Sequence, residues 1–231
     1  VIENGAGTMK LTKEGTGTQT LSGTSTYTGA TTISAGTLAL ASTGSIDNTS
    51  GVSLGTGGSF DVSAKTGGYT VSNLSGSGNV IGSLTVSTQL AIGNSPGTTS
   101  FDNLTLGGAS TYVYELTGGG ITADLGLVEG NLTLGSGALL DLVQLGTYTA
   151  NDKFTLFSYT RIPSGTLSGL ADGATFTDAG GIWKIDYNDT SAGLNGGTLS
   201  GASYVTVTAV PEPRAALLGG LGLLALLRRR K

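Results

Sequence analysis

The side chains in this sequence that could do chemistry are carboxylates. The 231 residues include no histidine and no cysteine, which excludes histidine-based triads, imidazole metal sites and thiol nucleophiles. Two carboxylates can cleave a glycosidic bond when they flank it at roughly 5–10 Å from each other. The candidates for such a pair are Asp61, Asp102, Glu115, Asp124, Glu129 and Asp141. Their spacing predicts no pair, so we expect solvated carboxylates at strand ends and turns, and a protein that is not an enzyme.

Other binding signals in the sequence are weak. The stretch GTGGSFDVS, residues 55–63, matches a calcium-binding nonapeptide pattern once. Because a single copy cannot build stacked half-sites, we expect a turn there, and no metal or cofactor. Trp183, in IWKIDY, could stack on a sugar ring, but a lone tryptophan in an alternating strand indicates a core residue. Asn-x-Ser/Thr sequons, which chance supplies in a chain so rich in Asn and Thr, occur at Asn48, Asn73, Asn103, Asn131 and Asn188.

Short strands must position any site in this chain. Forty-one residues are glycine and only 11% are charged, and Thr, Ser and Asn take the place of Lys and Glu. Runs such as TLALAS and SLTVS alternate between apolar and small polar residues with a period of two, which indicates half-buried strands. Glycine, serine and asparagine separate the runs, and no helical spacing precedes the C-terminal tail. The pattern predicts an all-β protein.

Two all-β architectures suit such strands, a β-sandwich and a parallel β-solenoid. A sandwich usually contains several bulky core residues, whereas residues 1–100 hold only Tyr27, Phe60 and Tyr69 as aromatics. Small side chains stacked in a narrow core, with Gly or Asn at each corner, favour the solenoid. Stacked Thr, Ser and Asn would also form hydrogen-bonded ladders between coils. We therefore predict a parallel β-helix.

Residues 11–40, LTKEGTGTQTLSGTSTYTGATTISAGTLAL, resemble the autotransporter-associated β-strand repeat of bacterial surface proteins. The resemblance is carried by Leu11, Lys13, Gly15, Gly17, Leu21, Ser22, Gly23, Tyr27, Gly29, Thr31, Ile33, Gly36, Thr37 and Leu38. It implies a right-handed parallel β-helix in a passenger region, usually with further copies upstream. The first ten residues contain no initiator Met and no apolar export segment, so we expect the chain to be the C-terminal part of a longer protein.

The character of the sequence changes after Ser87. Pro96 lies in a Gly-Asn-Ser-Pro-Gly corner, and longer alternating runs follow as far as Val210. Aromatic residues concentrate there, namely Phe154, Phe157, Tyr159, Phe176, Trp183, Tyr187 and Tyr204. A solenoid needs a terminal unit that closes its exposed strand edge. We predict a β-helix over residues 1–94 and a β-sandwich-like capping module with antiparallel hairpins over residues 95–209.

The last residues, 210–231, form a separate segment. An apolar run begins at Ala215 and ends at Leu227, and a basic cluster of Arg228, Arg229, Arg230 and Lys231 follows it. Thirteen residues of helix at 1.5 Å per residue span about 20 Å, less than the roughly 30 Å hydrocarbon core of a bilayer. We expect a short hydrophobic helix that enters the membrane transiently, with the basic cluster as a cytoplasmic stop-transfer signal.

Val210, Pro211, Glu212 and Pro213 stand just before the apolar run. A Pro-Glu-Pro motif, an apolar span and a basic end resemble the PEP-CTERM protein-sorting domain. Arg214 departs from that family, in which small or hydroxyl residues are more usual at this position. The resemblance implies recognition by an exosortase, a membrane transpeptidase-like enzyme of Gram-negative bacteria that make exopolysaccharide.

Together these features predict an exported, non-enzymatic structural or adhesin-like protein of the cell surface or extracellular matrix, such as a biofilm. Its partners would be exosortase, the inner membrane before processing, and exopolysaccharide. Nucleic acid has no electrostatic basis as a partner, because the net charge is −4 and the basic residues cluster only in the tail. The alternative is the spacer and sorting region of a polysaccharide-degrading enzyme whose catalytic domain lies upstream.

Overall fold

The computed structural model describes residues 1–93, 96–117, 122–197 and 199–211. These residues form one sheet of 16 strands and contain no helix. The strands are β1 (Leu11–Lys13), β2 (Thr18–Leu21), β3 (Thr31–Leu40), β4 (Val52–Asp61), β5 (Tyr69–Gly76), β6 (Asn79–Ile92), β7 (Thr98–Leu106), β8 (Thr111–Thr117), β9 (Thr122–Ala123), β10 (Leu125–Val128), β11 (Leu132–Leu134), β12 (Leu139–Gln144), β13 (Lys153–Tyr159), β14 (Thr175–Asp178), β15 (Gly181–Asp189) and β16 (Ser203–Val210).

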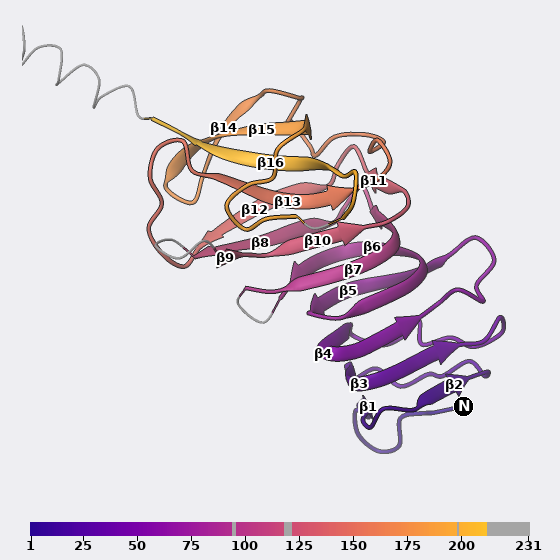
Figure 1. Ribbon diagram of the computed structural model, residues 1–231. Coiled ribbons are helices and arrows are strands. Elements are labelled where there is room, and N and C mark those ends of the chain that lie inside the picture. The colour runs from indigo at the N-terminus through magenta and orange to yellow at the C-terminus, as the bar shows by residue number, and fades with distance from the viewer. Residues whose placement is uncertain (94–95, 118–121, 198, 212–231) are drawn as a thin grey trace, which may run out of the picture.

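The N-terminal strands stack as successive coils of a parallel solenoid (Figure 1). Thr31 in β3 pairs with Leu11 of the preceding coil and with Val52 of the following coil, at nearly equal distances along the sequence. Parallel pairing at a nearly constant sequence interval means that each coil lies directly on the previous one. Later coils contain more residues, as the pairing of Phe101 with Val128 shows. The predicted all-β, mainly parallel architecture is confirmed.

Each coil contributes up to three short strand segments, which form three parallel ladders. The first ladder runs through β1, β3, β4, β5, β6, β8 and β12. The second runs through β2, β3, β4, β6, β7, β10 and β13. The third runs through β5, β6, β7 and β11. A long strand such as β3 belongs to two ladders because it bends at a corner, where its register shifts between Ile33 and Ala35.

Inward-pointing side chains form a continuous column along the second ladder. Paired in succession, the column consists of Gln19, Leu38, Phe60, Val80, Phe101, Val128 and Tyr159. From Leu38 onward, every member is at most 2% exposed. Successive side chains of a strand point to opposite faces, so the period-two pattern places the apolar residues inside. Full burial of each large apolar side chain contributes about 1.5–3 kcal/mol, which makes this column a main source of stability.

Glycine is required where the strands bend at corners. Gly36 in β3 has φ = 67°, and a Cβ at this position would lie 2.3 Å from the carbonyl oxygen of Gly15 on the adjacent coil. Gly76 in β5 has φ = 94°, and a Cβ there would lie 2.0 Å from the carbonyl oxygen of Leu54. Both positions combine a left-handed backbone with close approach of a neighbouring coil, so only glycine fits them.

The prediction of a turn at residues 55–63 is wrong, because residues 55–61 belong to the long strand β4. The strand continues through this glycine-rich corner and pairs with β3 on both sides of a register shift. A Cβ at Gly58 would lie 2.2 Å from the carbonyl oxygen of Ile33. The glycines therefore serve close packing between coils, which keeps the chain extended where composition alone indicates a turn.

Four strands at the C-terminal end pair antiparallel, in the order β13, β16, β15, β14. Strand β13 pairs parallel with β10 along one edge and antiparallel with β16 along the other. In Figure 1 these strands lie at the end of the stack opposite the N-terminus. Trp183 is fully buried there, with its ring centroid 4.6 Å from that of Tyr148 and 6.2 Å from that of Phe154. The antiparallel strands thus cover the edge that the last parallel strand would otherwise expose.

The predicted boundary between residues 94 and 95 falls between β6 and β7, which pair with each other. Parallel pairing continues beyond this point between β10 and β13, and an isolated parallel bridge joins Thr133 to Ser164. A short antiparallel pair joins β9 to β8, and the antiparallel partner of β13, the last strand of the second ladder, is β16, which begins at Ser203. The division into two units at residue 95 stays a prediction, and the change of strand direction lies later in the chain.

The sorting segment is described only at its beginning. Val210 ends β16, where it pairs with Ile182, and Pro211 follows as an exposed residue. The remaining predicted features lie outside the described residues: Glu212, Pro213, the helix from Ala215 to Leu227, and the basic cluster Arg228, Arg229, Arg230 and Lys231. Among the residues that the structure describes, no helix is long and apolar enough to cross a membrane.

Candidate functional site

Most of the candidate carboxylates reach solvent, as predicted. Those that are exposed or half-buried are Asp61, Asp102, Glu115, Glu129 and Asp141. The structure brings two of them together, because Asp102 in β7 and Glu129 directly after β10 line one pocket of about 200 Å³. They follow the paired residues Phe101 and Val128 on adjacent coils. Their separation in the sequence gives no sign of this neighbourhood, since it depends on the length of one coil.

Asp124 is fully buried, which corrects the expectation of a solvated carboxylate. Its Oδ1 accepts a hydrogen bond from the backbone N–H of Gly97 at 3.0 Å, and its Oδ2 accepts one from the backbone N–H of Glu115 at 2.9 Å. Burial raises the pKa of Asp124 to about 7, although the two N–H groups act in the opposite direction. Because Gly97 lies directly before β7, this side chain fastens the start of β7 to β8.

Asn195, between β15 and β16, joins the antiparallel strands to the solenoid. Its Nδ2 donates to the backbone carbonyl oxygens of Thr155 at 2.9 Å and Asp124 at 3.1 Å, and to the Tyr114 hydroxyl at 3.1 Å. Its Oδ1 accepts a hydrogen bond from the backbone N–H of Thr155 at 2.7 Å. Asn195 is absent from the residues predicted from the sequence, because an asparagine in a glycine-rich loop has no distinguishing local signal.

Outward-facing side chains form polar ladders on the faces of the stack. The third ladder carries the threonines Thr70, Thr85, Thr105 and Thr133, paired in succession. The second ladder carries Thr18, Thr37, Ser59, Asn79 and Ser100, also paired in succession. All of these side chains are exposed or half-buried. Since neighbouring strands lie about 4.8 Å apart, each ladder presents polar groups at regular spacing.

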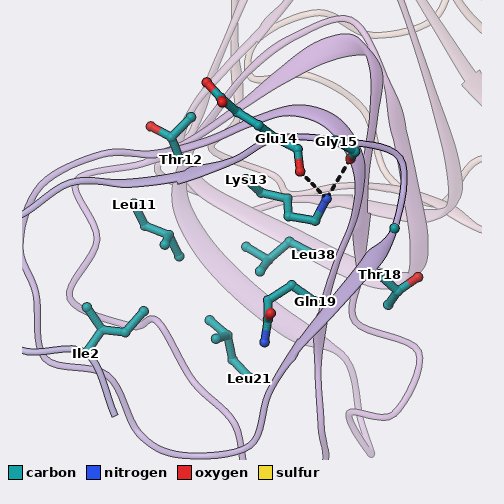
Figure 2. Close-up of a pocket in the computed structure, with 11 residues that line it drawn as sticks. Ile2, Leu11, Thr12, Lys13, Glu14, Gly15, Thr18, Gln19, Leu21 and Leu38 are labelled. Carbon is teal, nitrogen blue, oxygen red and sulfur yellow. Dashed lines mark hydrogen bonds between the residues drawn. The ribbon is translucent and has the colours of Figure 1, made fainter.

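A larger pocket, of about 540 Å³, lies at the N-terminal end of the stack (Figure 2). Leu11, Leu21 and Leu38 line it, together with Gln19, the first member of the core column. The Nζ of Lys13 donates to the backbone carbonyl oxygens of the next two residues at 2.8 Å each. Within the described residues, β1 and β2 pair only with β3. The pocket is therefore the open end of the core.

Trp183 and several of the sequon asparagines have structural contacts. Trp183 is buried and its Nε1 donates to the backbone carbonyl oxygen of Asp178 at 3.0 Å, so it is a core residue rather than a platform for a sugar. Asn73 donates through Nδ2 to the carbonyl oxygen of Ser50 at 2.7 Å. Asn103 accepts at Oδ1 from the backbone N–H of the next sequon asparagine, Asn131, at 2.8 Å. These asparagines thus connect neighbouring coils.

Among the described residues, no group of three or more His, Cys, Asp or Glu side chains could hold a metal ion.

Comparison with known proteins identifies one part of the chain. Residues 11–40 match the family model of the passenger-associated-transport-repeat, over the same residues as the repeat predicted from the sequence. No curated protein and no solved structure matches the chain. The matched residues span β1, β2 and β3, and thus the first pair of stacked coils. The chain therefore carries a passenger-associated-transport-repeat, which indicates an exported, surface or extracellular protein.

Proposed function

We propose that this chain is a non-enzymatic structural or adhesin-like protein of the cell surface or extracellular matrix, whose outer faces bind exopolysaccharide. The observation that carries the proposal is the regular series of polar ladders outside a continuous apolar core. A stacked solenoid holds hydroxyl and amide groups at fixed intervals along its length. The passenger-associated repeat at residues 11–40 supports the export of the chain.

A polymer of sugars is a suitable ligand for such a surface. Each hydroxyl–hydroxyl hydrogen bond contributes little in water, because it replaces bonds to solvent. Many such contacts along one rigid surface add together once the first has formed, since later contacts are intramolecular. The threonines of the third ladder would therefore act as a row, and loss of two of them should weaken binding without abolishing it.

The test is retention of the purified chain on a panel of insoluble polysaccharides. We expect binding to at least one polymer, and a loss of about three- to tenfold for the double variant Thr85→Val with Thr105→Val. Valine keeps the branched shape that suits a strand. Thr175→Val with Thr177→Val, at exposed positions of β14, is the matched control. Cleavage of any polymer, or no binding to the whole panel, would contradict the proposal.

The proposal includes sorting by an exosortase through Val210, Pro211, Glu212 and Pro213, with a transient stage at the inner membrane. The resemblance of residues 210–231 to a PEP-CTERM domain is its support. In a host with an exosortase, deletion of the whole sorting segment, from Pro211 to Lys231, should stop the processing of the protein and change its location. A chain in which Pro211, Glu212 and Pro213 alone are replaced by Ala should behave in the same way. Unchanged processing and location would exclude the sorting role.

A further inference from the structure

We propose that the outer face of the second ladder around Asp102 and Glu129 binds an amino-sugar polysaccharide that carries free ammonium groups. This inference rests on the proposed function, because it names the class of polymer and its place on the solenoid. The face consists of Asn79, Ile81, Ser100, Asp102 and Glu129, which line the pocket of about 200 Å³.

The charge distribution selects a cationic ligand. No Lys or Arg occurs between Lys65 and Lys153, a stretch that forms β5 to β12. The whole segment 1–211 has six basic and fourteen acidic residues, a net charge of −8. Within the described part of the chain, neither Asp102 nor Glu129 forms an ion pair. A face of this kind attracts cations and repels polymers of uronic acids.

The pocket offers three kinds of contact side by side. Asp102 is held in place, because its Oδ2 accepts a hydrogen bond from the backbone N–H of Gly82 at 2.7 Å. Its carboxylate and that of the exposed Glu129 can accept charge-assisted hydrogen bonds from an ammonium group. Asn79 and Ser100, which pair with each other on adjacent coils, can bond sugar hydroxyls.

The exposed side chain of Ile81 favours a sugar polymer over a simple polycation as the ligand of this pocket. It is the exposed hydrophobic residue of the pocket, with 36% of its surface accessible, and it pairs with Asp61 on the preceding coil. The C–H face of a pyranose ring can cover such a side chain and remove apolar area from water. Apolar, amide, hydroxyl and carboxylate groups at one place match the mixed surface of an amino sugar better than that of a flexible polylysine.

The experiment compares the binding of the full chain to chitosan, which is cationic, dextran, which is neutral, and alginate, which is anionic. We expect the tightest binding to chitosan, with affinity that falls as salt is added. Asp102→Asn with Glu129→Gln should weaken chitosan binding about three- to tenfold. Glu3→Gln with Glu14→Gln is the control, since it changes the net charge equally at the exposed N-terminal end. Ile81→Ser should also weaken chitosan binding.

Other outcomes would overturn the inference in distinguishable ways. Equal losses in the two charge variants would show a general effect of net charge rather than a site. Binding of dextran or alginate as tight as that of chitosan would remove the amino-sugar assignment and leave the proposed function intact. Polylysine binding equal to chitosan binding would show a face for any polycation. Failure to bind any polysaccharide would contradict both this inference and the proposed function.

Discussion

The carboxylate of Asp124 accepts a hydrogen bond from the backbone N–H of Gly97 at 3.0 Å, which joins two parts of the chain that are distant in sequence. The same carboxylate accepts the N–H of Glu115 at 2.9 Å. One buried side chain therefore holds Gly97, at the start of β7, and β8 together, at the point where the coils become longer. The backbone carbonyl of Asp124 in turn accepts the side chain of Asn195, so the link extends to the antiparallel strands.

The pH dependence of stability should report on Asp124. Burial raises its pKa to about 7, while an aspartate in an unfolded chain has a pKa of about 3.9. The folded state thus binds this proton more tightly, and ionisation destabilises it. The contribution of Asp124 to the unfolding free energy should fall as the pH rises from about 4 to about 7 and change little above that. Urea unfolding across this range measures it.

Asp124→Asn should flatten this pH profile, because the amide does not ionise. Asp141→Asn removes an exposed carboxylate and serves as the control, with a profile like that of the original chain. An unchanged slope in Asp124→Asn would show that another group is responsible.

The ion pair between Lys153 and Asp189 should make the unfolding free energy rise with pH in the acid range, which is opposite to the effect of Asp124. Their Nζ and Oδ2 atoms are 2.8 Å apart. Partial burial opposes ionisation of Asp189, but the hydrogen bonds from Lys153, Ser191 and Thr206 prevail and lower its pKa to about 2. A lowered pKa gives stability that is present above about pH 4 and is lost as the pH falls towards 2.

Lys153→Met should therefore reduce the unfolding free energy by about 1 kcal/mol at pH 7. The same variant should lose part of the acid dependence between pH 4 and pH 2. Lys184→Met, at an exposed position of β15, should leave both quantities unchanged. Chemical denaturation at pH 2, 4 and 7 distinguishes the two variants, and equal behaviour would contradict the role of the pair.

Alanine substitutions at two positions of the core column should lower the unfolding free energy by different amounts. Phe60 is fully buried in the middle of the column, whereas Gln19 is exposed at its N-terminal end. Phe60→Ala should lower the unfolding free energy by about 3–5 kcal/mol, because it leaves a cavity between stacked coils. Gln19→Ala should change it by less than about 0.5 kcal/mol. Similar values for the two variants would contradict the assignment of the column.

Asn195→Ala should loosen the attachment of the antiparallel strands. It leaves the backbone N–H of Thr155 without the side-chain acceptor that it has in the structure, at a cost of about 1–3 kcal/mol. In this variant, amide hydrogen exchange should accelerate more in β13 and β16 than in β3 and β4, relative to the original chain. Asn48→Ala, at an exposed turn position, is the control. Uniform acceleration along the whole chain would point to global destabilisation instead.

The strands and their inward faces can be predicted from the sequence alone. Alternation with a period of two depends only on neighbouring residues, so Leu38 and Leu40 can be assigned to one buried face without knowledge of the fold. The repeat at residues 11–40 is equally visible, because its motif is contained in one continuous stretch. The concentration of aromatics after residue 150 also predicts bulkier packing there, and Phe154, Phe157 and Trp183 are buried.

The contacts between distant residues cannot be predicted in this way, because they depend on how the coils stack. The coils lengthen along the stack, from the one that joins Leu11 to Thr31 to the one that joins Phe101 to Val128, and no local pattern sets this register. That register places Asp102 beside Glu129 in one pocket and buries Asp124 against Gly97. The same pairing between coils keeps β4 extended through a glycine-rich corner, where the sequence predicts a turn. Local chemistry sets the conformation of each short segment, while the contacts between coils depend on how much chain each loop contains.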